Sequence, residues 1–102
     1  MNLRKLAAGK ECQVRSALCN RDPATTVLAH WRQIGISGMG LKAPDILGAW
    51  CCSSCHRVVD ADTHSMNREG RELMLLRGVM RTQYQLIKLG IMDANGNIND
   101  TP

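Results

Sequence analysis

The chain has 102 residues and a formal net charge of +4 at pH 7, and 44% of its residues are hydrophobic. This length suits one domain and is too short for two independent cores. No stretch approaches the ~18 apolar residues of a membrane span, and residues 1–13 lack a secretory apolar segment, so we expect a cytoplasmic protein with no membrane partner. The positive charge favours an anionic partner such as nucleic acid.

Large aromatic side chains are nearly absent, with no Phe, one Tyr and two Trp, whereas there are five cysteines. Aromatic side chains normally supply much of a small core. In a reducing cytosol, cysteines clustered with histidines are more often metal ligands than disulfides. A bound metal is therefore expected to help hold this domain together.

The first half of the chain predicts short elements. Residues 1–10 form a basic arm with a short turn of helix, and residues 11–22 form a loose hairpin or knuckle. The segment TTVLAH predicts a strand that ends at His30. Three glycines and a proline in residues 33–45 predict a long loop, a type that is often functional.

The second half predicts a strand and two helices. ILGAWC is expected to form the strand, and a helix capped by Ser53 or Ser54 should follow it, with Val58 and Val59 buried. A longer amphipathic helix is predicted over residues 67–89, with Ser65 as a plausible cap and Gly90 as its end. Its apolar stripe is spaced three or four residues apart and is expected to face the core: Leu73, Leu76, Met80, Tyr84 and Ile87. The same stripe could instead hold a second copy in a homodimer, and residues 93–102 predict a polar tail.

The strongest motif is Cys52-Ser53-Ser54-Cys55, followed by His56. Two thiolates at this spacing can bind one tetrahedral zinc ion, and Cys12 and Cys19 are the candidates for the other two ligands. Cys51 is left over. A thioredoxin-like redox pair, a c-type haem attachment site and plain buried thiols are alternative interpretations of the motif.

A second group of possible ligands follows the motif. On an α-helix, Asp60 lies about 40° and His64 about 80° around the axis from His56, so the three share one face. Nitrogen and carboxylate ligands there suit a catalytic divalent ion with open positions. The alternative is a solvated face on which Asp60 pairs with Arg57.

His30 is a candidate general base, because an imidazole titrates near neutral pH and phosphodiester hydrolysis needs a base for water. A lone histidine is more often structural or merely exposed.

The order of these elements, with VLAH before a glycine-rich loop and CSSCH with a later TH, resembles the HNH (His-Me finger) endonucleases. More narrowly, ECQVR, VLAHW, the G-x-x-G-x-G loop and CSSCH are similar to small prophage-encoded nucleases of the YbcO type. The resemblance implies an α+β fold with a ββα-metal core, a structural zinc site and a C-terminal amphipathic helix, all in one nuclease domain over residues 1–92.

Carried over by motif, the resemblance assigns His30 as the general base and His56 to the middle position of the motif. His64 is then the last histidine of the motif. The four cysteines that match structural zinc ligands are Cys12, Cys19, Cys52 and Cys55. Two departures matter: Ala29 stands where many members have a metal ligand, and Asp60 sits at the short spacing from His56 that His64 exceeds. The second catalytic-metal ligand is therefore left open between Asp60 and His64.

Two functions compete on these features. The first is a metal-dependent endonuclease acting on DNA, with RNA as a further possible substrate, that uses structural zinc and a catalytic Mg, Mn, Ni or Zn ion. Arg32, Lys42 and Arg57, with Arg68, are then the nucleic-acid contacts. The second is a zinc-stabilised module that binds nucleic acid or protein without catalysis, which Ala29 favours. A dithiol redox protein is a third alternative.

Overall fold

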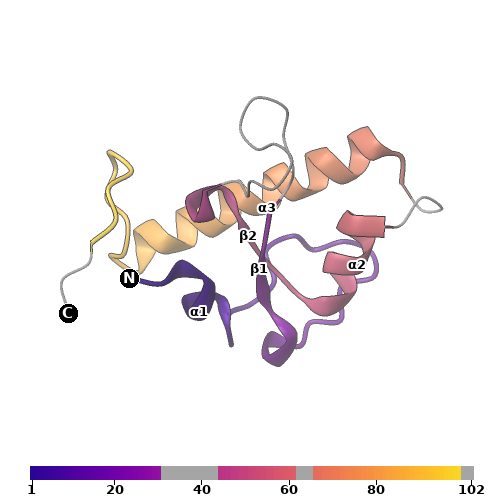
Figure 1. The fold of residues 1–102 in the computed structure, drawn as a ribbon, viewed down its shortest axis with the longest axis horizontal. Helices are drawn as coiled ribbons and strands as arrows, with labels where there is room; N and C mark the ends of the chain where they lie inside the picture. Colours follow the sequence, from indigo (N-terminus) through magenta and orange to yellow (C-terminus); the bar gives the residue numbers. More distant parts are fainter. Residues whose placement is uncertain (31–43, 62–65, 100–102) are drawn as a thin grey trace.

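The computed structural model describes residues 1–30, 44–61 and 66–99. It is a small α+β fold in which a two-stranded sheet lies beside one long helix (Figure 1). In chain order the elements are α1 (Leu3–Ala7), η1 (Pro23–Thr25), β1 (Val27–Ala29), η2 (Asp45–Leu47), β2 (Ala49–Cys51), α2 (Ser53–Ala61) and α3 (Arg68–Lys88). Within the described ranges, no helix is long and apolar enough to cross a membrane.

The sheet is antiparallel and pairs Leu28 with Trp50 at its centre. The predicted strand ILGAWC begins later than expected, because Asp45–Leu47 form a 3-10 turn before it. Gly48 links the two elements at a point of close approach. A Cβ at this position would lie 2.7 Å from Leu28 Cγ and 3.2 Å from the Ala29 carbonyl oxygen, so only glycine fits.

Helix α2 begins immediately after β2, as the sequence predicted, but Cys52 precedes it in place of a serine cap. The Cys52 carbonyl accepts the first helical hydrogen bond from His56 N at 2.9 Å, and its Sγ accepts one from Cys55 N at 3.4 Å. The predicted burial of the helix is confirmed, since Val58 and Val59 are 4% and 1% exposed. The thiol-bearing end of α2 is thus fixed to the sheet.

Helix α3 matches the predicted range of 67–89 to within one residue at each end. Asn67 caps it, because its side-chain oxygen accepts a hydrogen bond from Gly70 N at 2.8 Å. The expected cap, Ser65, lies outside the described residues. Gly90 follows the helix with a φ of +75°, which confirms the predicted end.

The buried face of α3 is not the predicted one. The residues expected in the core are exposed by 43 to 65%: Leu73, Leu76, Met80, Tyr84 and Ile87. The helix instead buries Leu75, Gly78, Val79, Thr82 and Leu86. Gly78 lets the helix approach Val14 and Ala49, and Thr82 Oγ1 accepts a hydrogen bond from Trp50 N at 3.0 Å. Leu75, Val79 and Leu86 thus supply the apolar contacts of the buried face, while Gly78 and Thr82 allow its close approach to the sheet.

Two clusters of buried residues form the core. One surrounds the cysteines and contains Val14, Ala29 and Leu75, and the other joins Ala7 and Trp50 to the end of α3. The tail predicted from residue 93 is partly folded, since Met92 is 7% exposed and forms an antiparallel bridge with Ile98. Residues 8–22 contain no strand, so the predicted hairpin or knuckle is an irregular turn of chain.

Candidate metal centre and neighbouring histidines

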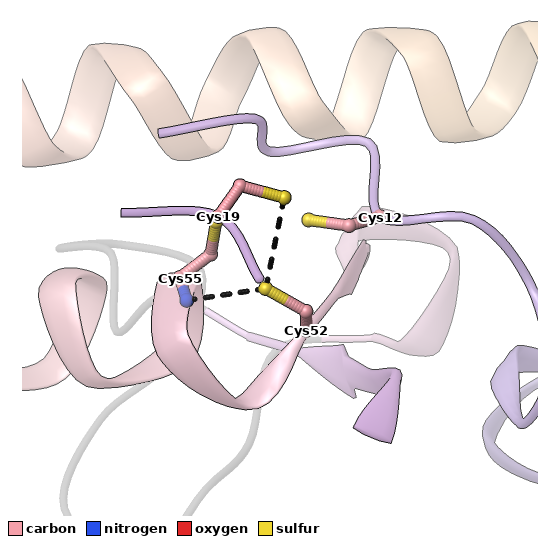
Figure 2. A group of neighbouring side chains, drawn as sticks. All are labelled: Cys12, Cys19, Cys52 and Cys55. Carbon is pink, nitrogen blue, oxygen red and sulfur yellow. Dashed lines mark hydrogen bonds between the residues drawn. The ribbon is translucent and has the colours of Figure 1, made fainter. Parts of the chain in front are cut away.

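Four cysteines converge from two parts of the chain (Figure 2). Cys12 and Cys19 come from the irregular segment before η1, Cys52 follows β2, and Cys55 lies in the first turn of α2. Their sulfur atoms all lie within 4.8 Å of one another, and Cys52 Sγ is 3.8 Å from Cys19 Sγ. A tetrahedral zinc ion with Zn–S bonds of about 2.3 Å requires sulfur atoms about 3.8 Å apart. The donor set and its spacing therefore fit zinc, as the sequence predicted.

All five thiols of the chain are free, so no disulfide competes for these ligands. Between Cys12 and Cys19 the chain turns at Ala17 and Leu18, where Cys19 N donates to the Ser16 carbonyl at 3.0 Å. Arg15, just before this turn, has a left-handed φ of +57°. Next to this turn, Ser16 N lies 3.4 Å and Ser16 Oγ 3.1 Å from Cys55 Sγ. These contacts orient the sulfur atom and satisfy part of its negative charge when it is ionised. Sequence reasoning missed Ser16, since no local pattern links it to a residue in α2.

The segment that carries the first two cysteines is held against both the sheet and α3. Gln13 N donates to the Trp50 carbonyl at 2.7 Å, and Arg81 Nη1 donates to the Gln13 carbonyl at 2.9 Å. Val14 is 2% exposed and packs against Gly78 of α3. Cys12 is thereby positioned by the two residues that follow it in the sequence.

The thiols differ in their readiness to ionise. A hydrogen bond from the Cys51 thiol is the largest cause that lowers the pKa of Cys12 to about 3, and it outweighs burial. Burial raises the pKa of Cys55 to about 12, although Ser16 opposes this effect, and burial also raises the pKa of Cys19. Closely packed thiols cannot all carry charge without a cation, so metal binding here would release protons.

His30 follows β1 and pairs with a residue that the sequence did not single out. Its Nε2 lies 2.9 Å from Asp45 Oδ1, and Arg4 Nε donates to the same oxygen at 3.2 Å. Partial burial acts to raise the pKa of Asp45, but the hydrogen bonds and charges of His30 and Arg4 hold it below its usual value. Asp45 is therefore an ionised acceptor. Because Asp45 accepts a hydrogen bond, a neutral His30 ring carries its proton on Nε2, and Nδ1 then carries the lone pair.

His56 and Asp60 share one face of α2, as the sequence predicted, and Asp60 pairs with His56. Their Nε2 and Oδ2 atoms are 3.2 Å apart, and both side chains are exposed to solvent. Among the described residues, only the four cysteines form a set of three or more possible ligands close enough to share one ion. His64, the third predicted ligand, lies outside the described residues.

The predicted nucleic-acid contacts are only partly described. Arg57 is exposed on α2 and Arg68 is exposed at the start of α3. Arg32 and Lys42 lie outside the described residues, as does most of the predicted loop of residues 33–45.

These features define a small α+β domain with a cluster of four cysteines whose geometry could hold a metal ion. The chain belongs to the family described as "Putative nuclease YbcO", whose sequence model matches residues 1–91. It is 43% identical over 94 residues to the protein named "Putative nuclease YbcO" from Escherichia coli strain K12, which covers 91% of this chain and 98% of the relative. Enterobacteria phage 82 encodes a relative of the same name with the same identity and coverage.

A solved structure shares the fold. It is described as "Structure of a putative bacteriophage protein from Escherichia coli str. K-12 substr. MG1655" and is 37% identical to this chain, with a TM-score of 0.69. The match covers 87% of this chain and all of the solved chain.

Proposed function

We propose that this protein is a metal-dependent endonuclease that hydrolyses DNA phosphodiester bonds. The observation that carries the proposal is the pair formed by His30 and Asp45 at the end of β1, at 2.9 Å. The order β1, β2, α2 supports the proposal, because a ββα-metal core would have the same order of elements, and His30, which follows β1, would then act as the general base. The relatives are named as nucleases, and the net charge of +4 favours a phosphate backbone.

In this proposal His30 removes a proton from the attacking water. Asp45 accepts the Nε2 proton of the ring, so Nδ1 is the basic atom, and the carboxylate stabilises the imidazolium that forms. Asp45 is thus a positioning residue and does not touch the substrate. The His30 side chain is 17% exposed, so part of it is accessible to water.

A divalent ion is proposed to bind next to α2 through His56, Asp60 and His64. Of these residues, His56 and Asp60 already lie side by side on the exposed face of α2. An Mg, Mn, Ni or Zn ion there would stabilise the negative charge on the phosphate and on the leaving oxygen. Arg57, Arg32 and Lys42 are proposed to contact the backbone of the DNA, and we expect weak sequence selectivity because phosphate contacts carry no sequence information.

The test is cleavage of plasmid and single-stranded DNA by protein dialysed against a mild chelator. The dialysis is adjusted to remove loosely bound ions while one zinc ion per chain is retained. The protein is then supplied with Mg, Mn, Ni or Zn, and the wild type is compared with His30→Ala. Loss of a general base should lower the cleavage rate about 10²- to 10⁴-fold.

Arg4→Ala is the matched control. It removes a half-exposed partner of Asp45 but leaves the imidazole in place, so the turnover number should be kept. Zinc content and thermal stability of all three proteins show whether the fold is intact. Equal rates for wild type and His30→Ala would rule out His30 as the base.

The second candidate is a zinc-stabilised module that binds nucleic acid or protein without catalysis. Ala29 favours it, because this residue is 1% exposed, packs in the core and offers no metal ligand at a position where many HNH enzymes have one. A protein that retains zinc and binds DNA but cleaves none with any of the four ions would support this second function.

A further inference from the structure

The exposed apolar side chains of α3 form one continuous surface, which we call the α3 stripe: Leu73, Leu76, Met80, Tyr84 and Ile87. Each side chain exposes 43 to 65% of its surface. At 100° per residue, all five lie within about 40° of the direction of Met80, roughly opposite the face that packs on β2. The largest contiguous apolar patch on a soluble monomer is typically about 300–600 Å² and is often functional, and larger patches mark interaction sites.

The spacing of these residues along α3 is symmetric about Met80. The successive spacings are three, four, four and three residues, so Leu73 and Ile87 are equally far from Met80. Leu76 and Tyr84 are also equally far from it. A two-fold axis turns a surface onto itself, so in an antiparallel helix pair centred on Met80 this spacing places apolar residues opposite apolar residues.

The charges on α3 favour the same orientation. Near its amino end α3 carries Glu69 and Glu72 together with Arg68 and Arg71. Lys88 lies at its last turn, with its Nζ atom 5.4 Å from the Tyr84 ring centre. In an antiparallel pair centred on Met80, Glu72 is level with Lys88 of the second copy, whereas a parallel pair would place like charges level. The antiparallel pair also places opposite ends of the helix dipoles together.

We propose that the α3 stripe is the interface of a homodimer in which two α3 helices pack antiparallel, with the two-fold axis at Met80. The two copies bring Leu73 level with Ile87 and Leu76 level with Tyr84. The contact, about 21 Å long at about 1.5 Å per residue, is short. We expect a weak dimer, with a dissociation constant of roughly micromolar order. This proposal does not depend on nuclease activity.

Sedimentation equilibrium of the zinc-loaded protein over roughly 1 to 500 μM, a range chosen around micromolar affinity, tests the proposal. The apparent mass should rise from the chain mass of 11.3 kDa to twice that value. Met80→Glu places two carboxylates together at the axis and should keep the protein monomeric. Met80 is 65% exposed, so the variant should retain the thermal stability and zinc content of the wild type. Ala24→Glu, which adds the same charge at an exposed position in η1 away from α3, should dimerise normally (Figure 1).

Mixing Met80→Glu with Met80→Lys provides the sharpest outcome. Each variant alone should be monomeric, and the mixture should dimerise, because only at a two-fold axis does residue 80 meet itself. A wild type that is monomeric at every concentration would overturn the proposal, as would a dimer unaffected by Met80→Glu. A mixture that stays monomeric would overturn the placement of the axis at Met80.

Discussion

Two buried cysteines of this chain allow the metal centre to be tested with one chemical change. Cys51 and Cys55 are both fully buried, yet only Cys55 belongs to the set of four converging thiols. We expect Cys55→Ala to lose bound zinc and Cys51→Ala to keep one zinc ion per chain. The comparison separates ligand loss from the loss of one buried sulfur atom.

The two variants should differ strongly in stability. Removing one buried sulfur leaves a small cavity and costs about 1 kcal/mol, comparable to removing a methylene group. Structural zinc contributes an apparent ~10–16 kcal/mol in small zinc domains, which is comparable to the whole ~5–15 kcal/mol stability of an ordinary domain. Cys55→Ala should therefore show no cooperative thermal transition, whereas Cys51→Ala should unfold a few degrees below the wild type.

Zinc content by atomic emission and thermal unfolding by circular dichroism, each with and without a strong chelator, measure both effects. The wild type in excess chelator should resemble Cys55→Ala. If the wild type unfolds at the same temperature with and without chelator, or if Cys51→Ala loses its zinc while Cys55→Ala keeps it, the assignment of the four ligands is wrong.

Three further changes test the fold around the site. Gly78→Ala should lower the free energy of unfolding in urea by about 1–3 kcal/mol despite the better helix propensity of alanine, because its Cβ would lie 2.9 Å from Val14 Cγ2; an increase would show that α3 does not pack this closely. Asn67→Ala should cost about 1 kcal/mol in the same assay through loss of the α3 cap, and no change would remove that role. Because the pKa of Asp45 is lowered in the folded state, its ionised form stabilises the fold above about pH 4, and this contribution is lost as the pH falls through the lower folded value. Chemical unfolding at a series of pH values should therefore show a steeper acid loss in the wild type than in Asp45→Asn, and parallel curves would refute the interaction with His30.

The cysteine cluster was predictable because metal ligands combine strict chemistry with a short spacing. The pair Cys52 and Cys55 requires no knowledge of the rest of the fold, and a closed zinc site demands two more ligands, which leaves few choices among five cysteines. The ends of α3 were predictable for a similar reason. Gly90 stops the helix through a local backbone conformation that any fold would share.

The orientation of α3 was not predictable from hydropathy, because two of its faces have helical spacing. The stripe centred on Met80 carries the larger side chains, and the opposite face carries Gly78 and Thr82. These two residues stabilise the packing of α3 only through contacts with other elements of the fold. Gly78 allows contact with Val14, and Thr82 accepts a hydrogen bond from the backbone of β2. The contact of Asp45 with His30 was not predictable for a similar reason, because the two residues are fifteen positions apart in the sequence.

The metal centre and the proposed nuclease site are linked through α2. Among the described residues, the buried cluster around the thiols contains one side chain larger than valine, Leu75, so apolar burial by these residues supplies little to hold α2 in place. Cys52 and Cys55 fix the first turn of this helix, and His56 is the next residue along the chain. A zinc ion bound by the four thiols would therefore set the direction in which His56 and Asp60 point. Loss of zinc should accordingly reduce any activity that depends on these two residues, even though neither is among the four zinc ligands.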